Sequence, residues 1–409
     1  MSKFYPLAVL ALAGMTLPLR AEPNVIVSLA SVGDRIRAQN PDLAAARLRI
    51  QEALGRVNQS GRLANPGLET ALDQSSGFRE GKFEIGISQR FPLTNRLKLE
   101  EDVSLTELKS AEAEVREVER QLTGQAREAV VKVLATRQRR ELLREQIGVS
   151  KEFAEFLSEI AAKGEGSPLD VGQAKLEAAS LALEIRQLDA GEAALLGELK
   201  PLLGMRPGET LSVSGTLPPP MPPPAETDPS HRPDFQAAKL AALAAKQGVA
   251  LEQSRRYDDV EGGIFAAAER TEDAPEGYQN EAIIGLRFKI ALPFWNKNEG
   301  AIQEAAAKKE RKEMEAVALG RNIQLEAEAA RAEMQEWAKM IAEINDTLLP
   351  LAAEQSAFAE TTYRNGQGEI QSVLRSREKR LQLAAARIAA LREFHLARVR
   401  HETARGGGF

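Results

Sequence analysis

The residues that could carry out chemistry are scattered along the chain. None of the three histidines has a second histidine at the i, i+4 spacing that places two imidazoles on one helix face for a metal: His231, His395 and His401. His401 and Glu402 lack the remainder of a zinc-protease motif, and residues 77–82 have neither the spacing nor the Ser or Thr of a phosphate loop. The chain has no cysteine, which excludes thiolate ligands and nucleophiles. We therefore predict no catalytic, cofactor-binding or metal-ligating residue, and no enzyme.

The charged residues indicate helix surfaces. Charged residues make up 28% of the chain and aromatic residues only 5%, a balance typical of long helices and coiled coils. Most carboxylates stand beside Lys or Arg at helical spacing, where solvated ion pairs are expected. The 54 basic and 59 acidic groups leave a net charge of -5. No basic stripe is present, so nucleic acid is not an expected partner.

The chain repeats one plan twice. A helix start, an alternating segment ending in proline and a glycine break recur in the same order and at nearly the same spacing: Asn40 and Arg232, Pro92 and Pro293, Gly164 and Gly366. We predict a first structural repeat over 22–205 and a second over 232–409. The Pro-rich stretch within 206–231 is stiff and predicts a linker lying across the outside of the helices. Each repeat exposes surfaces that it cannot bury alone.

The N-terminal residues predict export. Lys3 precedes an apolar run from Leu7 to Leu19, which fits the core of a signal peptide and is short for a membrane-spanning helix. We expect residues 1–21 to be this signal peptide, with a buried or interfacial segment as the alternative. No other stretch is continuously apolar enough to span a bilayer as a helix, so any membrane insertion after export requires strands.

Two segments alternate cleanly between apolar and other residues. Phe83 to Phe91 and Ile284 to Leu292 each run for about nine residues, the length of a tilted membrane strand with one lipid-facing side. Weaker strands precede both, at 68–72 and 260–268, and turn-rich residues separate each pair. Two hairpins are therefore predicted, in a membrane or packed on helices. In a membrane, one face would point into a lumen and carry Glu84, Arg90, Arg287 and Lys289.

Four strands cannot close a barrel, and open strand edges are not tolerated in lipid. Copies of the chain must then share one barrel, and three copies would supply twelve strands, within the range of outer-membrane barrels. In such a homotrimer we expect Arg287 and Lys289 to form a cationic collar.

The remaining sequence predicts long packed helices. Apolar residues follow steps of three and four from Leu108 to Val133 and from Ile323 to Leu348, the pattern of a coiled-coil seam. A helix over 296–364 would be about 100 Å long. Pro350 lies within it and predicts a kink or break. Gly164 and Gly366 permit the chain to reverse, making two long helical hairpins.

The two bends are the predicted place for a gate, because few seam contacts hold the helices together there. We expect the tip and gate to contain the two bend glycines and the polar residues around them: Gly164, Asp170, Tyr363, Arg364, Gly366, Ser372 and Arg375.

These features together resemble a known family. The repeated plan, the passage from Leu292 to Ile302 leaving the last strand, and Tyr363 to Gly366 followed by Val373 are similar to outer-membrane efflux proteins of the TolC family, especially the heavy-metal branch. The resemblance implies a homotrimer with a twelve-stranded β-barrel in the outer membrane and a helical tunnel through the periplasm. It also implies a periplasmic adaptor, an inner-membrane efflux pump and outer-membrane lipid as partners, and a passive exit duct as the function.

The chain departs from the family in two respects. It lacks the N-terminal cysteine that many members lipidate. Ser372 and Arg375 stand where some members have acidic residues, and Gly368 stands where an arginine can occur, so the closing contacts must be composed differently. The alternative from another class is a periplasmic adaptor-like or structural coiled-coil protein. The two hairpins of membrane length argue against that alternative.

Overall fold

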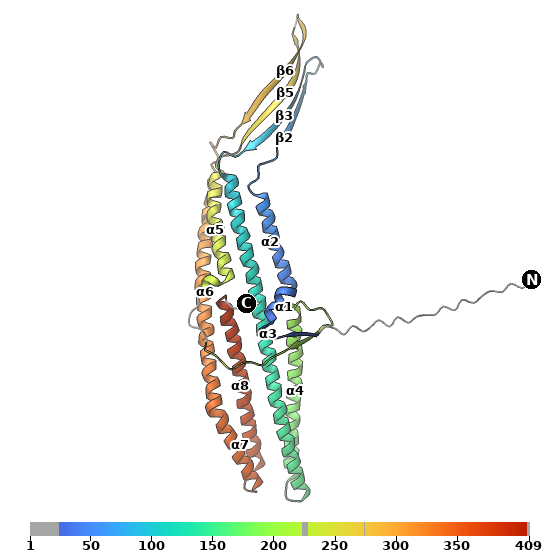
Figure 1. The fold of residues 1–409 in the computed structure, drawn as a ribbon, viewed down its shortest axis with the longest axis vertical. Helices are drawn as coiled ribbons and strands as arrows, with labels where there is room; N and C mark the ends of the chain where they lie inside the picture. Colours follow the sequence, from blue (N-terminus) through green and yellow to red (C-terminus); the bar gives the residue numbers. More distant parts are fainter. Residues whose placement is uncertain (1–23, 223–227, 274, 407–409) are drawn as a thin grey trace, which may run out of the picture.

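The computed structural model describes residues 24–222, 228–273 and 275–406. The predicted signal peptide lies outside these residues. The molecule is a long helical rod with a narrow four-stranded sheet at one end (Figure 1). Its elements follow in the order β1 (Asn24–Val27), α1 (Val32–Gln39), α2 (Pro41–Gln59), β2 (Gly67–Gln74), β3 (Gly81–Phe91), α3 (Arg96–Ala162), α4 (Pro168–Leu202), β4 (Thr210–Val213), η1 (Pro229–His231), α5 (Pro233–Ser254), β5 (Val260–Asp273), β6 (Gly277–Lys289), α6 (Glu299–Glu343), η2 (Ile344–Leu348), α7 (Leu349–Arg364) and α8 (Ile370–Ala404).

The sheet joins the two predicted hairpins. Its strand order is β2-β3-β5-β6, antiparallel throughout. Strand β6 ends at Lys289, three residues before the predicted end at Leu292. The reason is that its partner β5 begins at Val260 and pairs Glu261 with Lys289, so almost no ladder remains beyond this point. Within one chain the outer edges of β2 and β6 have no neighbouring strand in the described sheet.

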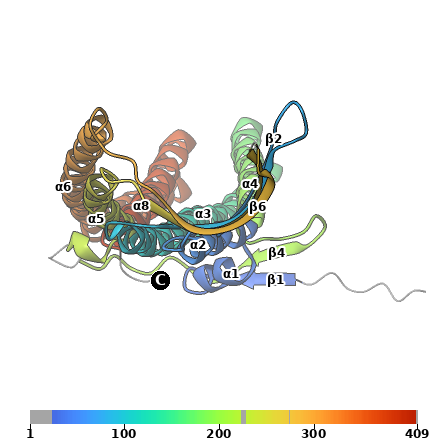
Figure 2. The same cartoon turned by 90° about the horizontal axis from the view of Figure 1, so that it is seen from above.

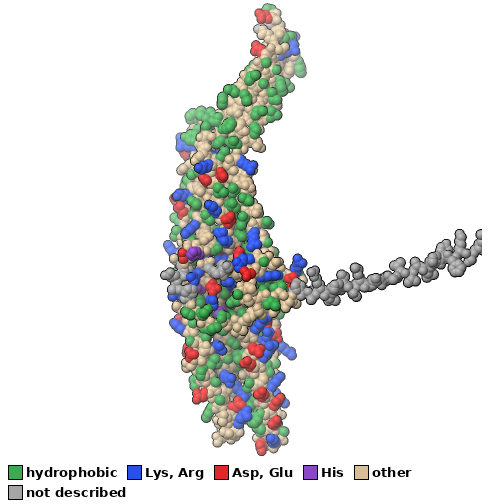
Figure 3. All heavy atoms as spheres, in the orientation of Figure 1, with side chains coloured by type: hydrophobic (Ala, Val, Ile, Leu, Met, Phe, Trp, Pro, Cys, Tyr) green, Lys and Arg blue, Asp and Glu red, His purple; other side chains and the backbone are tan. Residues whose placement is uncertain are grey.

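The two faces of the sheet differ in character. Ile284, Leu286 and Phe288 are 84%, 69% and 74% exposed, an extent unusual for large apolar side chains in water. On the opposite face Glu84 and Ala267 are buried. Figure 2 shows from above that the sheet is curved. In Figure 3 hydrophobic side chains dominate much of the visible surface of the sheet, whereas charged side chains are dispersed over the helical rod.

The helices form two hairpins, α3 with α4 and α7 with α8 (Figure 1). Helix α3 has 67 residues, which is about 100 Å at 1.5 Å per residue. The predicted seams are largely buried: Ala111, Val115, Ala126, Ala129 and Val133 on α3, and Ile323, Ala327, Ala330, Met334 and Ile341 on α6. No described helix is both long and apolar enough to cross a membrane.

The second long helix is not continuous. Helix α6 ends at Glu343, and the five residues Ile344–Leu348 form a π-helical turn before α7 begins. Pro350 is the second residue of α7, two positions after this turn. A proline has no N–H to donate to the carbonyl four residues earlier, and widening the preceding turn accommodates that loss. The predicted interruption is therefore present as a change of helix type.

The middle of the rod carries a small unit that the sequence did not predict. Strand β1 pairs in parallel with β4, and Val27 and Val213 belong to the core formed with α1, α2, α3 and α4. Strand β4 lies inside the predicted linker, so part of that segment has its own structure. Further along, Leu217 is buried, and the Pro218 carbonyl lies 2.8 Å from His395 Nε2 on α8. The segment thus contacts helices of both hairpins.

Candidate functional sites at the tip and in the sheet

The tip of the rod brings Asp170 and Tyr363 together. Asp170 lies in the first turn of α4, which Ser167 caps by accepting a hydrogen bond from the Leu169 amide. Tyr363 lies in the last turn of α7, and its hydroxyl donates a hydrogen bond of 3.0 Å to Asp170 Oδ2. Burial, and then the Asp170 carboxylate, raise the pKa of Tyr363 to about 12. The phenol therefore remains a donor at neutral pH.

The two bends lie where the sequence predicted them. Gly164 and Gly366 have φ angles of +80° and +73°, in the left-handed region that favours glycine. An added Cβ at either position would meet nothing within 4 Å. These two glycines are therefore favoured because they adopt a left-handed backbone conformation, and not because a side chain would clash there.

An aromatic cluster supports the tip contact. Phe153 on α3 packs edge-on against Tyr363, with ring centroids 6.0 Å apart. The Arg377 guanidinium lies 4.2 Å from the Phe153 ring centroid, and that of Arg364 lies 4.6 Å from Phe156. These contacts connect α3 of the first hairpin with α7 and α8 of the second.

The other predicted tip residues have different surroundings. Arg364 donates to Glu360 on its own helix at 2.8 Å, so it does not pair with Asp170. Ser372 and Arg375 are exposed on α8. Sequence reasoning missed Phe153, Glu360 and Arg377. The spacing of Phe153 and Phe156 on a helix otherwise poor in aromatic residues was the available signal.

Two acidic side chains of the sheet pair with Arg287, one residue of the predicted cationic collar. This side chain donates to Glu69 Oε2 at 3.0 Å and also to Glu84. In the strand register Glu69 on β2 is level with Gly285 and Glu84 on β3 is level with Ile283, and both carboxylates lie on the same face of the sheet as Arg287. Two acids therefore face this arginine, which the sequence of β6 alone did not reveal. The collar of Arg287 and Lys289 in a trimer stays a prediction.

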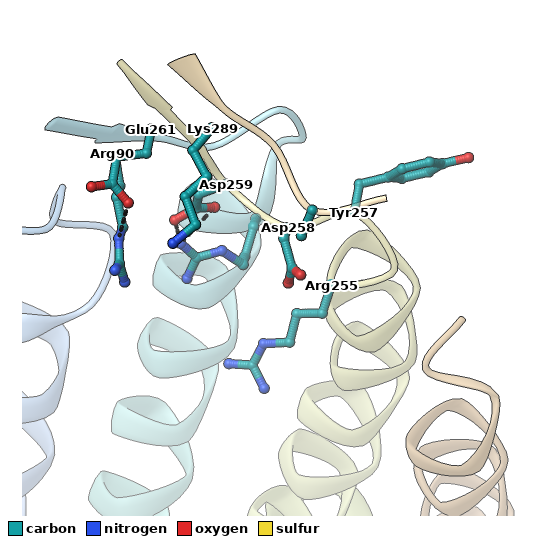
Figure 4. Close-up of a pocket in the computed structure, with 9 residues that line it drawn as sticks. Arg90, Arg255, Tyr257, Asp258, Asp259, Glu261 and Lys289 are labelled. Carbon is teal, nitrogen blue, oxygen red and sulfur yellow. Dashed lines mark hydrogen bonds and ion pairs between the residues drawn. The ribbon is translucent and has the colours of Figure 1, made fainter. Parts of the chain in front are cut away.

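A second charged group lies where the sheet meets the helices (Figure 4). Arg90 Nε is 3.3 Å from Glu261, and Arg96 donates to Asp259 at 2.8 Å. Lys289 lines the same cavity, whose volume is about 430 Å³. Charges of both signs meet here, and the pairs Arg96–Asp259 and Arg90–Glu261 connect the start of α3 and the end of β3 to the start of β5.

The histidines and carboxylates of the described residues do not cluster as metal ligands would. Within residues 24–222, 228–273 and 275–406, no group of three or more His, Asp or Glu side chains is arranged to hold a metal ion. His395 is buried, and its Nε2 is hydrogen-bonded to the Pro218 carbonyl. His231 is exposed on η1.

Comparison with known proteins points to one family. Residues 32–197 match the family model described as "Outer membrane efflux protein". The structure of CusC, a protein described as undergoing transmembrane channel formation, has a TM-score of 0.77 at 16% identity, covering 93% of this chain and 92% of that one. The chain is therefore similar to outer membrane efflux proteins, in sequence over residues 32–197 and in fold over most of its length.

Two further relatives agree with this assignment. The outer membrane protein VceC from Vibrio cholerae has a TM-score of 0.73 at 20% identity, with 93% of this chain and 96% of VceC covered. The cobalt-zinc-cadmium resistance protein CzcC of Cupriavidus metallidurans is 25% identical over 335 residues, which are 79% of this chain and 76% of CzcC.

The similarity to outer membrane efflux proteins confirms several of the predictions. An outer membrane efflux protein is an outer-membrane channel that extends into the periplasm, and the predicted fold class of long helical hairpins with four strands per chain is confirmed. Proteins of this family are homotrimeric components of tripartite pumps, with an adaptor and an inner-membrane pump as partners. The alternative of an adaptor-like coiled-coil protein is set aside. The family and its structural neighbours are channels rather than enzymes.

Proposed function

We propose that this outer membrane efflux protein is the passive exit duct of a pump for heavy-metal cations, without catalytic activity of its own. The cargo is supported by the similarity to CzcC over 79% of the chain. The duct needs no metal-binding centre, because a conducting path requires binding weak enough to release each ion. Energy would come from the inner-membrane pump.

The duct would be closed at its periplasmic tip. The observation that carries this assignment is the hydrogen bond from Tyr363 to Asp170, which ties the last turn of α7 to the first turn of α4. Gly164, Gly366, Arg364, Ser372 and Arg375 lie at or beside the same two bends. One such contact contributes only about 1 kcal/mol. Three copies in a trimer would close the tip while leaving it weak enough for an adaptor to open.

The concave face of the sheet would line the lumen. Glu84, Arg90, Arg287 and Lys289 lie on that face, and the highly exposed apolar residues of β6 lie on the other. In a trimer the apolar face would contact lipid, which explains why side chains such as Ile284 are left uncovered by their own chain.

Metal tolerance tests the proposed cargo. The gene would be deleted in its host, and growth would be measured in graded cobalt, zinc and cadmium, and separately in dyes and detergents. Selective sensitivity to the metals, restored by the wild-type gene, is the expected result. Sensitivity to organic compounds alone would contradict the metal assignment while leaving the exit-duct function in place.

A further inference from the structure

A buried arginine near the tip has one unpaired nitrogen. Arg377 on α8 is 5% exposed. Its Nη2 donates to Glu360 on α7 at 2.8 Å, and its guanidinium lies over Phe153 of α3. Its Nη1 is buried and has no hydrogen-bond partner among the described residues. A buried donor without a partner is destabilising, and more so when the group is charged.

Two unpaired acceptors lie on the opposite hairpin. Gln173 and Glu177 stand one turn apart on α4, and Gln173 Oε1 and Glu177 Oε2 are buried without partners in the described part of the chain. Burial raises the pKa of Glu177; the charge of Arg377 opposes that rise, and the charge of Glu378 adds to it. Arg377 is therefore near enough to act on Glu177 electrostatically, yet no hydrogen bond joins them.

We propose that Arg377 is a positioning residue with two alternative partners. In the arrangement described here it pairs with Glu360 within the second hairpin. In a second arrangement of the hairpins it would exchange Glu360 for Glu177 and thereby tie α8 to α4. This inference rests on the proposed gate and deepens it, because it assigns an ion pair to the open state as well as to the closed one.

Contacts at the tip connect Tyr363 to Arg377 and provide the route for this exchange. Tyr363 holds Asp170 on α4 and packs on Phe153, and Phe153 in turn stacks on Arg377. Releasing Tyr363 from Asp170 would free the start of α4 to move along α8. Glu177 of α4 already lines one cavity with Leu374 and Glu378 of α8. An exchange of one ion pair for another keeps the energy gap between the two arrangements small, as a switch requires.

The test measures open probability of the purified trimer in a planar bilayer. Glu360→Gln keeps the size of the side chain but removes the charge that holds Arg377 in the closed arrangement. It should raise open probability several-fold. Glu177→Gln removes the second partner and should abolish most of that rise when combined with Glu360→Gln. Glu354→Gln, an exposed carboxylate on the same helix α7, is the control and should leave open probability at the wild-type value.

The outcomes separate the switch from the gate. An equal rise from Glu360→Gln with and without Glu177→Gln would overturn the exchange, since Glu177 would then play no part. No effect of Glu360→Gln, while Tyr363→Phe still opens the channel, would also overturn the exchange but keep the gate. No effect of either change would overturn the gate itself. Should Glu177→Gln prevent assembly, Glu177→Asp, whose carboxylate is one methylene shorter and should pair less well with Arg377, replaces it with the same expected direction of change.

Discussion

Tyr363 and Asp170 lie 193 positions apart in the chain, yet the Tyr363 hydroxyl is 3.0 Å from the Asp170 carboxylate. The contact joins the corresponding bends of the two hairpins. Because burial and the carboxylate raise the pKa of Tyr363 to about 12, this bond should persist across the neutral pH range.

Removing this bond should open the tip. Asp170→Ala combined with Tyr363→Phe takes away both partners, at about 1 kcal/mol per chain, and should raise single-channel conductance of the trimer. Crosslinking should still stop at three copies, because the long seams are unchanged. If conductance stays at the wild-type value while changes at Arg287 alter it strongly, the constriction lies in the sheet region.

The two faces of β6 should differ in their tolerance of charge. Leu286 is 69% exposed on the apolar face, where an arginine near the middle of the bilayer would destabilise the barrel by about 2 to 4 kcal/mol. Leu286→Arg should therefore reduce the assembled trimer far more than Arg287→Leu. Detergent extraction followed by native gels measures the fraction assembled. Equal tolerance would show that the assigned faces are wrong.

Arg287 should hold the lumen near neutrality. Arg287→Gln leaves Glu69 and Glu84 without their common partner, so the channel should become more selective for cations. The reversal potential across a salt gradient reports this directly. Arg321→Gln, the same loss of charge on α6 outside the sheet, serves as control. A shift toward anion selectivity would contradict the ion pairs described here.

The absence of a side chain at Gly285 leaves room for the aromatic ring of Phe265. A Cβ at Gly285 would lie 2.5 Å from Phe265 Cζ, so Gly285→Ala should push the ring off the concave face and lower conductance. Phe265→Ala in the same chain should restore it. At Gly262, on the opposite face, the nearest atom to an added Cβ is 3.6 Å away, and Gly262→Ala should have little effect. Lowered conductance in both glycine variants would argue for a general loss of sheet structure.

Acidification should weaken the fold through its buried histidines. Burial lowers the pKa of His395 and of His401, with the positive charge of Arg398 adding to the effect at His395 and Glu402 opposing it at both. The neutral form is favoured in the folded chain, so this stability is present above the unfolded-state value of about 6.5 and is lost as pH falls below it. The thermal unfolding midpoint should drop between pH 7.5 and 5.5, and less so in His395→Gln. A midpoint that rises over this range would contradict the burial argument.

The sequence by itself determined the elements whose signals are local or periodic. The seam from Ile323 to Leu348, the alternation from Ile284 to Phe288 and the glycine bends at Gly164 and Gly366 each depend on residues close together in the chain. The need for shared strands followed from the same local reading, because four strands with open edges cannot stand alone in lipid. The division into two repeats stays a prediction from that pattern.

Only the tertiary structure decided which distant side chains meet. The pairing of Arg287 with Glu69 and Glu84 depends on the register of strands from both halves, and the two short strands β1 and β4 acquire order only by pairing across the chain. Arg377, Phe153 and Glu177 each looked like ordinary helix-surface or seam residues. Their roles depend on how three long helices are rotated about their axes. A local spacing of apolar residues at three and four positions identifies the apolar face of a helix, but it does not identify which helix packs against that face.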